Sequence, residues 1–163
     1  MALTHAETLE ATVRVLTRNG IEVHLTGGQG CCGALNTHSG EPDSAIEMAK
    51  QNIDSFLSAN PAAIVSASAG CGAAMKDYGE LLANEPEYVD KAKQVALLTK
   101  DIHELLVEYE FEAPTKPLNV KVTYQDPCHL LNVQRITDAP RAILNSIPGL
   151  ELIELGEAAV CCG

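Results

Sequence analysis

The chain of 163 residues is long enough for one ordinary domain and too short for two domains with full hydrophobic cores. Its 22 acidic and 11 basic side chains give a formal net charge of -11, which argues against nucleic acid as a partner because phosphate binding requires basic patches. No apolar run reaches the roughly 20 residues of a transmembrane helix, and the N-terminus lacks the regions of a secretory signal, so we expect a cytoplasmic protein that meets a membrane, at its inner face, only through partners.

The first predicted element is an amphipathic helix that follows Thr4 and ends at Asn19-Gly20. A short β-type run at 21–25 follows it and leads into the first pair of cysteines. Pro42 opens a second helix, and the nearly all-apolar run 62–68 predicts a strand covered on both faces. The first half of the chain therefore alternates between helix and strand.

The second half continues this alternation. Residues 75–111 favour helix in two or three pieces, residues 119–125 a third strand, residues 140–146 a helix, and residues 150–155 a fourth strand. Alternation at this spacing predicts an α/β fold, with a parallel sheet of about four strands and helices on its faces. In such sheets the turns that follow the strands gather at the C-terminal edge, where ligands bind.

The six cysteines fall in short turns that contain glycine or proline, each after a predicted strand. Structural disulfides are rare in the cytosol, so clustered thiols there indicate metal or redox chemistry. Small buried hydrophobes scattered by chance would not be expected to occupy these turns. The candidate metal and cofactor ligands are Cys31, Cys32, Cys71, Cys128, Cys161 and Cys162.

The two Cys-Cys-Gly segments belong to an internal repeat with an offset of 130 residues. Upstream, Gly20-Ile21 matches Gly149-Leu150 after a slip of one residue, each after an amphipathic helix. We therefore expect two pseudo-repeated half-units: residues 1–112 as the last part of one unit and residues 113–163 as the first part of the next. The matched residues are Val23, Leu25, Cys31, Cys32 and Gly33 with Ile153, Leu155, Cys161, Cys162 and Gly163.

The motifs "GCCGALNTHSG", "AGCGAAMKDYG", "QDPCHLLNVQ" and the closing "CCG" resemble the cysteine-rich CCG domain, and most of all that of the glycolate oxidase iron–sulfur subunit. They are also similar to the CCG-containing subunit of heterodisulfide reductase and to iron–sulfur proteins of lactate utilisation. The longer glycolate oxidase subunits carry a ferredoxin-like part that is absent here, so the chain resembles the middle of a tandem CCG region.

The resemblance implies an iron–sulfur electron-transfer module that binds [4Fe–4S] clusters, with cubane and noncubane forms both open. It would pass electrons from a flavoprotein subunit that oxidises glycolate or a related 2-hydroxy acid towards a quinone-linked acceptor. The ferredoxin-like part of the longer subunit would be a second partner. Chemistry on the substrate would belong to the flavoprotein, and the sequence contains no arrangement that identifies a catalytic residue of its own.

The residues themselves explain why thiolates would suit such a cluster. Iron–sulfur clusters are held by cysteine thiolates, and Gly30 and Gly33 can supply the turn needed to aim two adjacent cysteines at one site. Each half-unit offers three cysteines, one fewer than a closed four-thiolate site. Whether three suffice depends on flanking sequence, on a ligand other than cysteine or on an open iron position.

Four alternatives stay open. The first is a catalytic cluster that reduces disulfides, as in heterodisulfide reductase, although Cys71 here lacks the Cys-x-x-Cys pattern of that enzyme. Zinc is the second, and it usually takes paired Cys-x2–4-Cys knuckles. A redox-active vicinal disulfide and a cluster-free scaffold are the others.

Several other residues have both a functional and a plainer interpretation. His38 and His129 could donate to cluster sulfur, but local helix capping is favoured. Lys76, Asp77 and Tyr78 match the family motif, yet they equally fit a solvated first turn of a helix.

Overall fold

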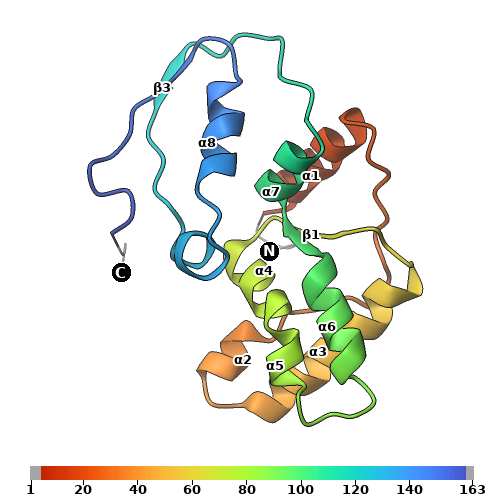
Figure 1. Ribbon diagram of the computed structural model, residues 1–163. Helices are drawn as coiled ribbons and strands as arrows, with labels where there is room; N and C mark the ends of the chain where they lie inside the picture. Colours follow the sequence, from red (N-terminus) through yellow and green to blue (C-terminus); the bar gives the residue numbers. More distant parts are fainter. Residues whose placement is uncertain (1–4, 161–163) are drawn as a thin grey trace. The chain divides into compact units, whose positions relative to one another are not determined.

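Residues Glu22–Asp101 pack together as one unit, and the described residues before and after this segment form another. The computed structural model describes residues 5–160, which Figure 1 draws as a coloured ribbon. We call Glu22–Asp101 the central unit, and residues 5–21 together with 102–160 the flanking unit. Each is described by itself.

The central unit is mostly helical and contains one pair of short strands. Its longest helix, α3, begins at Pro42, where the ring fixes a helical φ and the missing N–H would have had no partner in any case. In Figure 1, α3 and α6 lie side by side. The elements are α2 (Ala34–His38), α3 (Pro42–Ser58), β1 (Ile64–Ser66), α4 (Ala69–Lys76), α5 (Tyr78–Leu81), α6 (Val89–Leu98) and β2 (Thr99–Asp101).

The core of the central unit includes one of the candidate ligands. Small residues of α3 allow close helix packing, since Ala49 is fully buried beside Ile53. Cys32 belongs to this core and is only 8% exposed. The sulfur of Cys32 is therefore held by packing as well as by the turn. The core residues are Cys32, Ala49, Ile53, Ile64, Met75, Tyr78, Leu82, Ala92 and Val95.

Strands β1 and β2 are parallel, with Ile64 opposite Thr99 and Ser66 opposite Asp101. The sequence did not predict β2, because Thr-Lys-Asp lacks an apolar pattern. Thr99 is nevertheless buried, and its hydroxyl donates to the Val95 carbonyl at 2.7 Å. This local hydrogen bond lets a polar residue occupy an interior strand position.

The flanking unit contains a second parallel pair, β3 with β4, in which Val120 lies opposite Leu150. Helix α8 contacts both α7 and β4. The Asn19 side chain accepts a hydrogen bond of 2.6 Å from the Glu112 N–H, which ties the end of α1 to the segment after α7. The elements are α1 (Ala6–Arg18), α7 (Ile102–Glu108), β3 (Val120–Val122), a π-helix η1 (His129–Val133), α8 (Asp138–Asn145) and β4 (Leu150–Leu152).

The mixed helix and strand class is confirmed, but the expected single sheet of about four strands is not. Within residues 5–160 the strands form two separate parallel pairs. The run 21–25 is not a strand, since Leu25 is 76% exposed and the residues after it are bound by side chains of α3. The expectation that the cysteine turns share the edge of one sheet was therefore wrong as stated.

Two glycines that the sequence comparison matched have similar backbone conformations. Gly20 follows α1 with a φ of +75°, and Gly149 follows α8 with a φ of +78°. Both matched positions thus adopt the left-handed conformation that glycine permits. Among the helices of residues 5–160, none combines the length and the apolar character needed to cross a bilayer.

Candidate functional site

The fold of the central unit brings together thiols that are far apart in the sequence. Cys71 is the third residue of α4, soon after strand β1, and its sulfur is hydrogen-bonded to the Cys32 thiol. Cys32 is buried, Cys71 is partly buried and Cys31 is exposed. The unit therefore presents a contacting thiol pair with a third cysteine adjacent to it in the chain.

The pKa values of the two contacting thiols are shifted in opposite directions. The hydrogen bond from Cys32 lowers the pKa of Cys71 to about 6, and a second bond from Ser68 adds to this effect while burial opposes it. The same hydrogen bond and burial raise the pKa of Cys32. Cys71 is therefore the more acidic thiol of the pair, and the hydrogen bond from Cys32 favours its thiolate form.

This pairing predicts the pH dependence of Cys71 reactivity in the reduced, cluster-free chain. Because the folded pKa is depressed, Cys71 should react as a thiolate at neutral pH and lose reactivity as the pH falls through about 6. Cys32→Ala removes the stabilising donor, so the midpoint should move up towards the ordinary value of 9.0. Iodoacetamide labelling read by peptide mass spectrometry measures the profile.

The control is Cys31→Ala, which removes the neighbouring exposed thiol and leaves the Cys32–Cys71 contact in place. In this variant the midpoint for Cys71 should stay near 6. A Cys71 profile unchanged by Cys32→Ala would contradict the assigned hydrogen bond.

The first cysteine turn is bound along one face of α3. Ser55 donates to the Gly27 carbonyl at 2.9 Å, and Gln51 donates to the Gly28 carbonyl at 2.6 Å. Asn52 accepts from the Gly30 N–H at 2.7 Å. Backbone groups that a strand ladder would otherwise pair thus find partners on a helix.

Asn52 and Tyr78 also form hydrogen bonds with the backbone carbonyls of the two cysteines. The Asn52 amide donates to the Cys31 carbonyl at 2.8 Å and to the Tyr78 hydroxyl at 3.2 Å. The Tyr78 hydroxyl donates to the Cys32 carbonyl at 3.1 Å. Burial raises the pKa of Tyr78 to about 12, so the hydroxyl keeps its proton at neutral pH and remains a donor.

Sequence patterns pointed to Tyr78 only in part and did not point to Asn52. Tyr78 was as compatible with a solvated helical turn, yet it is fully buried, whereas Asp77 beside it is exposed. Asn52 was missed altogether. A signal was present, because Asn52 lies seven residues after Ala45 and three after Ala49 on the buried stripe of α3, where an unpartnered amide would be costly.

Gly33 closes the turn in a conformation that favours glycine. Its φ is +83°, and a Cβ there would lie 3.1 Å from the Cα of Ala45. The prediction that glycines shape this turn is confirmed for Gly33, which precedes the first residue of α2. Gly30 contributes differently, through the N–H that binds Asn52.

In the flanking unit, the residues before Cys128 lie against a segment far along the chain. The Gln125 side chain donates to the carbonyls of Ala158 at 2.8 Å and Val160 at 2.9 Å. The Asp126 N–H also donates to Ala158, at 3.0 Å. Cys128 itself is partly buried at the start of η1. The predicted ligands Cys161 and Cys162 lie outside the described residues.

Arg141 stabilises the same region from α8. Its guanidinium makes two hydrogen bonds to Asp126, of 2.8 and 2.7 Å, and another of 2.9 Å to Glu154. It also lies over the ring of Tyr124, 5.2 Å from the centroid. The hydrogen bonds from Arg141 hold the pKa of Asp126 below its ordinary value. No sequence pattern indicated this network, since its members are distant in the chain.

The two histidines near the cysteine turns lie at the ends of short helical elements. His38 ends α2 and His129 begins η1, and neither is buried. Within residues 5–160, no three His, Cys, Asp or Glu side chains form a group suited to a single metal ion. A cluster bound by one thiolate per iron does not need ligands that meet at one point.

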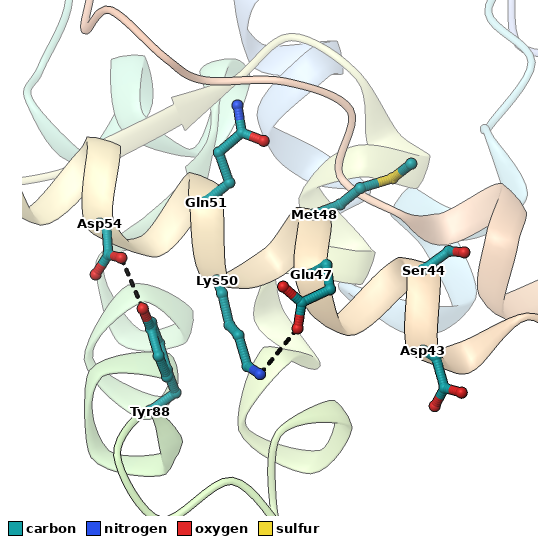
Figure 2. Close-up of a pocket in the computed structure, with 8 residues that line it drawn as sticks. All are labelled: Asp43, Ser44, Glu47, Met48, Lys50, Gln51, Asp54 and Tyr88. Carbon is teal, nitrogen blue, oxygen red and sulfur yellow. Dashed lines mark hydrogen bonds and ion pairs between the residues drawn. The ribbon is translucent and has the colours of Figure 1, made fainter.

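A surface groove runs along α3 and is lined by other residues than the cysteines. Figure 2 shows Lys50 directed towards Glu47, at 3.0 Å, and Tyr88 directed towards Asp54, at 2.7 Å. These contacts are made within α3 or between α3 and the residue before α6, and no cysteine lines the groove. The lining residues are Asp43, Ser44, Glu47, Met48, Lys50, Gln51, Asp54 and Tyr88.

The chain matches a known protein family. The family described as "CCG: Cysteine-rich domain" matches residues 1–76 and 122–163. The two matched segments contain Cys31, Cys32 and Cys71 in the first and Cys128, Cys161 and Cys162 in the second.

Curated relatives are longer than this chain. It is 39% identical over 158 residues to the probable glycolate oxidase iron–sulfur subunit of Bacillus subtilis, covering 96% of the chain and 36% of that protein. It is 39% identical over 154 residues to a subunit of the fumarate reductase (CoM/CoB) of Methanothermobacter marburgensis, and this match covers 94% of the chain and 29% of that protein. It is 33% identical over 162 residues to lactate utilization protein A of Geobacillus kaustophilus, and this match covers 99% of the chain and 67% of that protein. The chain thus spans about a third of the length of the first two.

Proposed function

Because the chain belongs to the cysteine-rich CCG domain family, we propose that its cysteines bind iron–sulfur clusters and that it serves as an electron-transfer module. The observation that carries this proposal is the contact between Cys32 and Cys71, thiols from two segments of the chain, with Cys31 adjacent. Thiolates of this kind are the ligands that iron–sulfur clusters take.

The donor set of the central unit fits such a group. Its three sulfurs come from a glycine-containing turn and from the first turn of a helix, where backbone N–H groups favour negative charge. Cys31, Cys32 and Cys71 would hold one cluster, and Cys128, Cys161 and Cys162 would hold another. We propose the [4Fe–4S] type for both. A bound cluster would supply one-electron storage, while the protein supplies its ligands and surroundings.

Names of the relatives suggest the wider role. Relatives named as glycolate oxidase iron–sulfur subunits support a flavoprotein partner that oxidises glycolate or another 2-hydroxy acid, with electrons passing to a quinone-linked acceptor. The proposed location is the cytoplasm, with membrane contact only through partners. The segments matched by the family, together with Gly20 and Gly149, support two repeated half-units within 1–112 and 113–163.

Anaerobic reconstitution of the chain with ferrous iron and sulfide tests the proposal. We expect bound iron, acid-labile sulfide and visible absorption that bleaches on reduction. Cys71→Ser and Cys128→Ser should each remove about half of the iron, because each site loses a thiolate that serine replaces poorly. The double variant should bind little.

The matched control is Ser146→Ala, a substitution of similar size that removes a hydroxyl bound to the Ile143 carbonyl of α8 and leaves the cysteines in place. It should retain the full iron content. Less than one cluster per chain without visible absorption, or equal iron in the native chain and the double variant, would contradict the proposal.

A second candidate function is reduction of disulfides at the cluster. The resemblance of the cysteine motifs to heterodisulfide reductase favours it. Against it, the residue three after Cys71 is Ala74, a partly buried alanine packed on the core in place of a further thiol. Assay of the reconstituted chain with a small mixed disulfide and a reduced viologen dye separates the two, because only the catalytic candidate predicts turnover.

A further inference from the structure

We propose that Asn52 and Tyr78 are positioning residues, which hold the peptide groups of the Cys31-Cys32 turn in the conformation that brings Cys32 to Cys71. The assignment of these cysteines as cluster ligands rests on the proposed function. The positioning itself is a property of the chain's own residues and can be tested without a cluster.

Each polar group of the Asn52 and Tyr78 side chains forms a hydrogen bond, either with the backbone of the turn or with the other of these two side chains. The Asn52 carbonyl accepts from the Gly30 N–H, and its amide donates to the Cys31 carbonyl and to the Tyr78 hydroxyl. The Tyr78 hydroxyl in turn donates its own hydrogen bond to the Cys32 carbonyl. Three successive residues, Gly30 to Cys32, are therefore bound by two side chains.

The burial of both side chains indicates that their hydrogen bonds have a specific role. Asn52 is 1% exposed and Tyr78 is 0% exposed. An amide and a phenol hydroxyl are unfavourable in a core unless they are hydrogen-bonded, and an apolar side chain of similar size would avoid that cost. What the polar pair provides and apolar residues would not is a defined position for the carbonyls of Cys31 and Cys32.

The pair also connects the two segments that bear the thiols. Asn52 lies on α3, which binds the turn, and Tyr78 begins α5, directly after the helix α4 that carries Cys71. The hydrogen bond between them therefore links the support of one thiol segment to the support of the other. Loss of the Tyr78 hydroxyl should release Cys32 while leaving the hydrocarbon packing of the ring in place.

Tyr78→Phe in the reduced, cluster-free full chain tests this inference. Loss of one neutral hydrogen bond shifts a local opening equilibrium by about fivefold, so Cys32 should be alkylated by N-ethylmaleimide about fivefold faster. Cys31 is already exposed, so its rate should change by less than about twofold. Amide exchange at Gly30 should also accelerate, because its acceptor Asn52 loses a hydrogen-bond partner.

The matched control is Tyr88→Phe, which removes a phenol hydroxyl from the same unit where it binds Asp54 and not the cysteine turn. Equal Cys32 rates in Tyr78→Phe and Tyr88→Phe would overturn the inference. Urea unfolding of both variants is measured alongside. A general loss of stability would accelerate labelling of Cys32 and Cys71 alike, which would also overturn a role specific to the turn.

Asn52→Asp provides a second variant. It keeps an acceptor for Gly30 but removes both amide donors, so Cys32 labelling should accelerate at least as much as in Tyr78→Phe. After reconstitution, the electron paramagnetic resonance spectrum of the reduced cluster should differ from the native spectrum in Tyr78→Phe and not in Tyr88→Phe. If the labelling results hold and no cluster forms in the native chain, the positioning role stands and the proposed function fails.

Discussion

Gly33→Ala should lower the free energy of unfolding of the central unit by about 3 kcal/mol. Two costs add: a left-handed conformation at an alanine costs about 1–2 kcal/mol, and forcing a methyl group into a packed site costs about 1–3 kcal/mol. Both apply at Gly33, where φ is +83° and the added Cβ would lie 3.1 Å from the Cα of Ala45. Urea unfolding followed by circular dichroism measures the change.

Two glycines of the same turn separate these costs. Gly28 has a φ of +89° with open space around it, so Gly28→Ala carries only the conformational cost. Gly27 has open space and no positive φ, so Gly27→Ala should change stability by less than about 0.5 kcal/mol. If Gly33→Ala cost no more than Gly28→Ala, the close approach of Gly33 to α3 would be wrong.

Arg141→Met should destabilise the flanking unit by about 3 kcal/mol at neutral pH. Removing the guanidinium leaves Asp126, which is 6% exposed, as a buried carboxylate without its ionic partner. Breaking a buried pair in this way typically costs about 3–5 kcal/mol, and the partial exposure of Arg141 places the expectation at the lower end. Urea unfolding at pH 7 measures it.

The dependence on pH follows from the direction of the pKa shift. In the native chain the pKa of Asp126 is lowered by Arg141, so the pair stabilises the fold above the ordinary value of 3.8 and this contribution is lost as the pH falls through the lower folded pKa. In the variant, burial without a partner raises the pKa of Asp126, and protonation relieves the cost. The difference between native chain and variant should therefore shrink from pH 7 to pH 4.

Lys121→Met is the matched control. It removes a cation from the same unit, but the ion pair of Lys121 with Glu151 is largely exposed on both sides. Exposed pairs contribute about 0–1 kcal/mol, so little change is expected. Similar losses in Arg141→Met and Lys121→Met would show that burial of Asp126 is not what makes the first pair important.

Local patterns predicted the helices better than the sheet. The apolar stripe and Pro42 anticipated α3, and the run 62–68 contains β1. The pairing of strands could not be predicted, because Thr99 and Asp101 are buried through hydrogen bonds and strand contacts that leave no apolar pattern. The run 21–25 has strand-like composition, yet the residues after it are bound by a helix.

The sequence pointed to the cysteines of the thiol site but not to most of the residues that support them. Spacing between cysteines identified Cys31, Cys32 and Cys71, of which the structure brings Cys32 and Cys71 into contact. Asn52 and Arg141 act through partners 13 to 26 residues away in the sequence, and one sequence carries no record of such pairs. A polar residue on an otherwise buried helical stripe was the one local sign of Asn52.

The attachment of the first cysteine turn to α3 constrains how the length of the chain can vary. Gly33 meets α3 at Ala45, and Gly30 meets it at Asn52, seven residues later. Seven residues are about two turns of an α-helix, so both contacts fall on one face, and each added residue rotates the rest of the helix by about 100°. An insertion between 45 and 52 would leave one contact in place and turn the other away from the thiols, whereas the exposed residues 59–60 after α3 carry no such restriction.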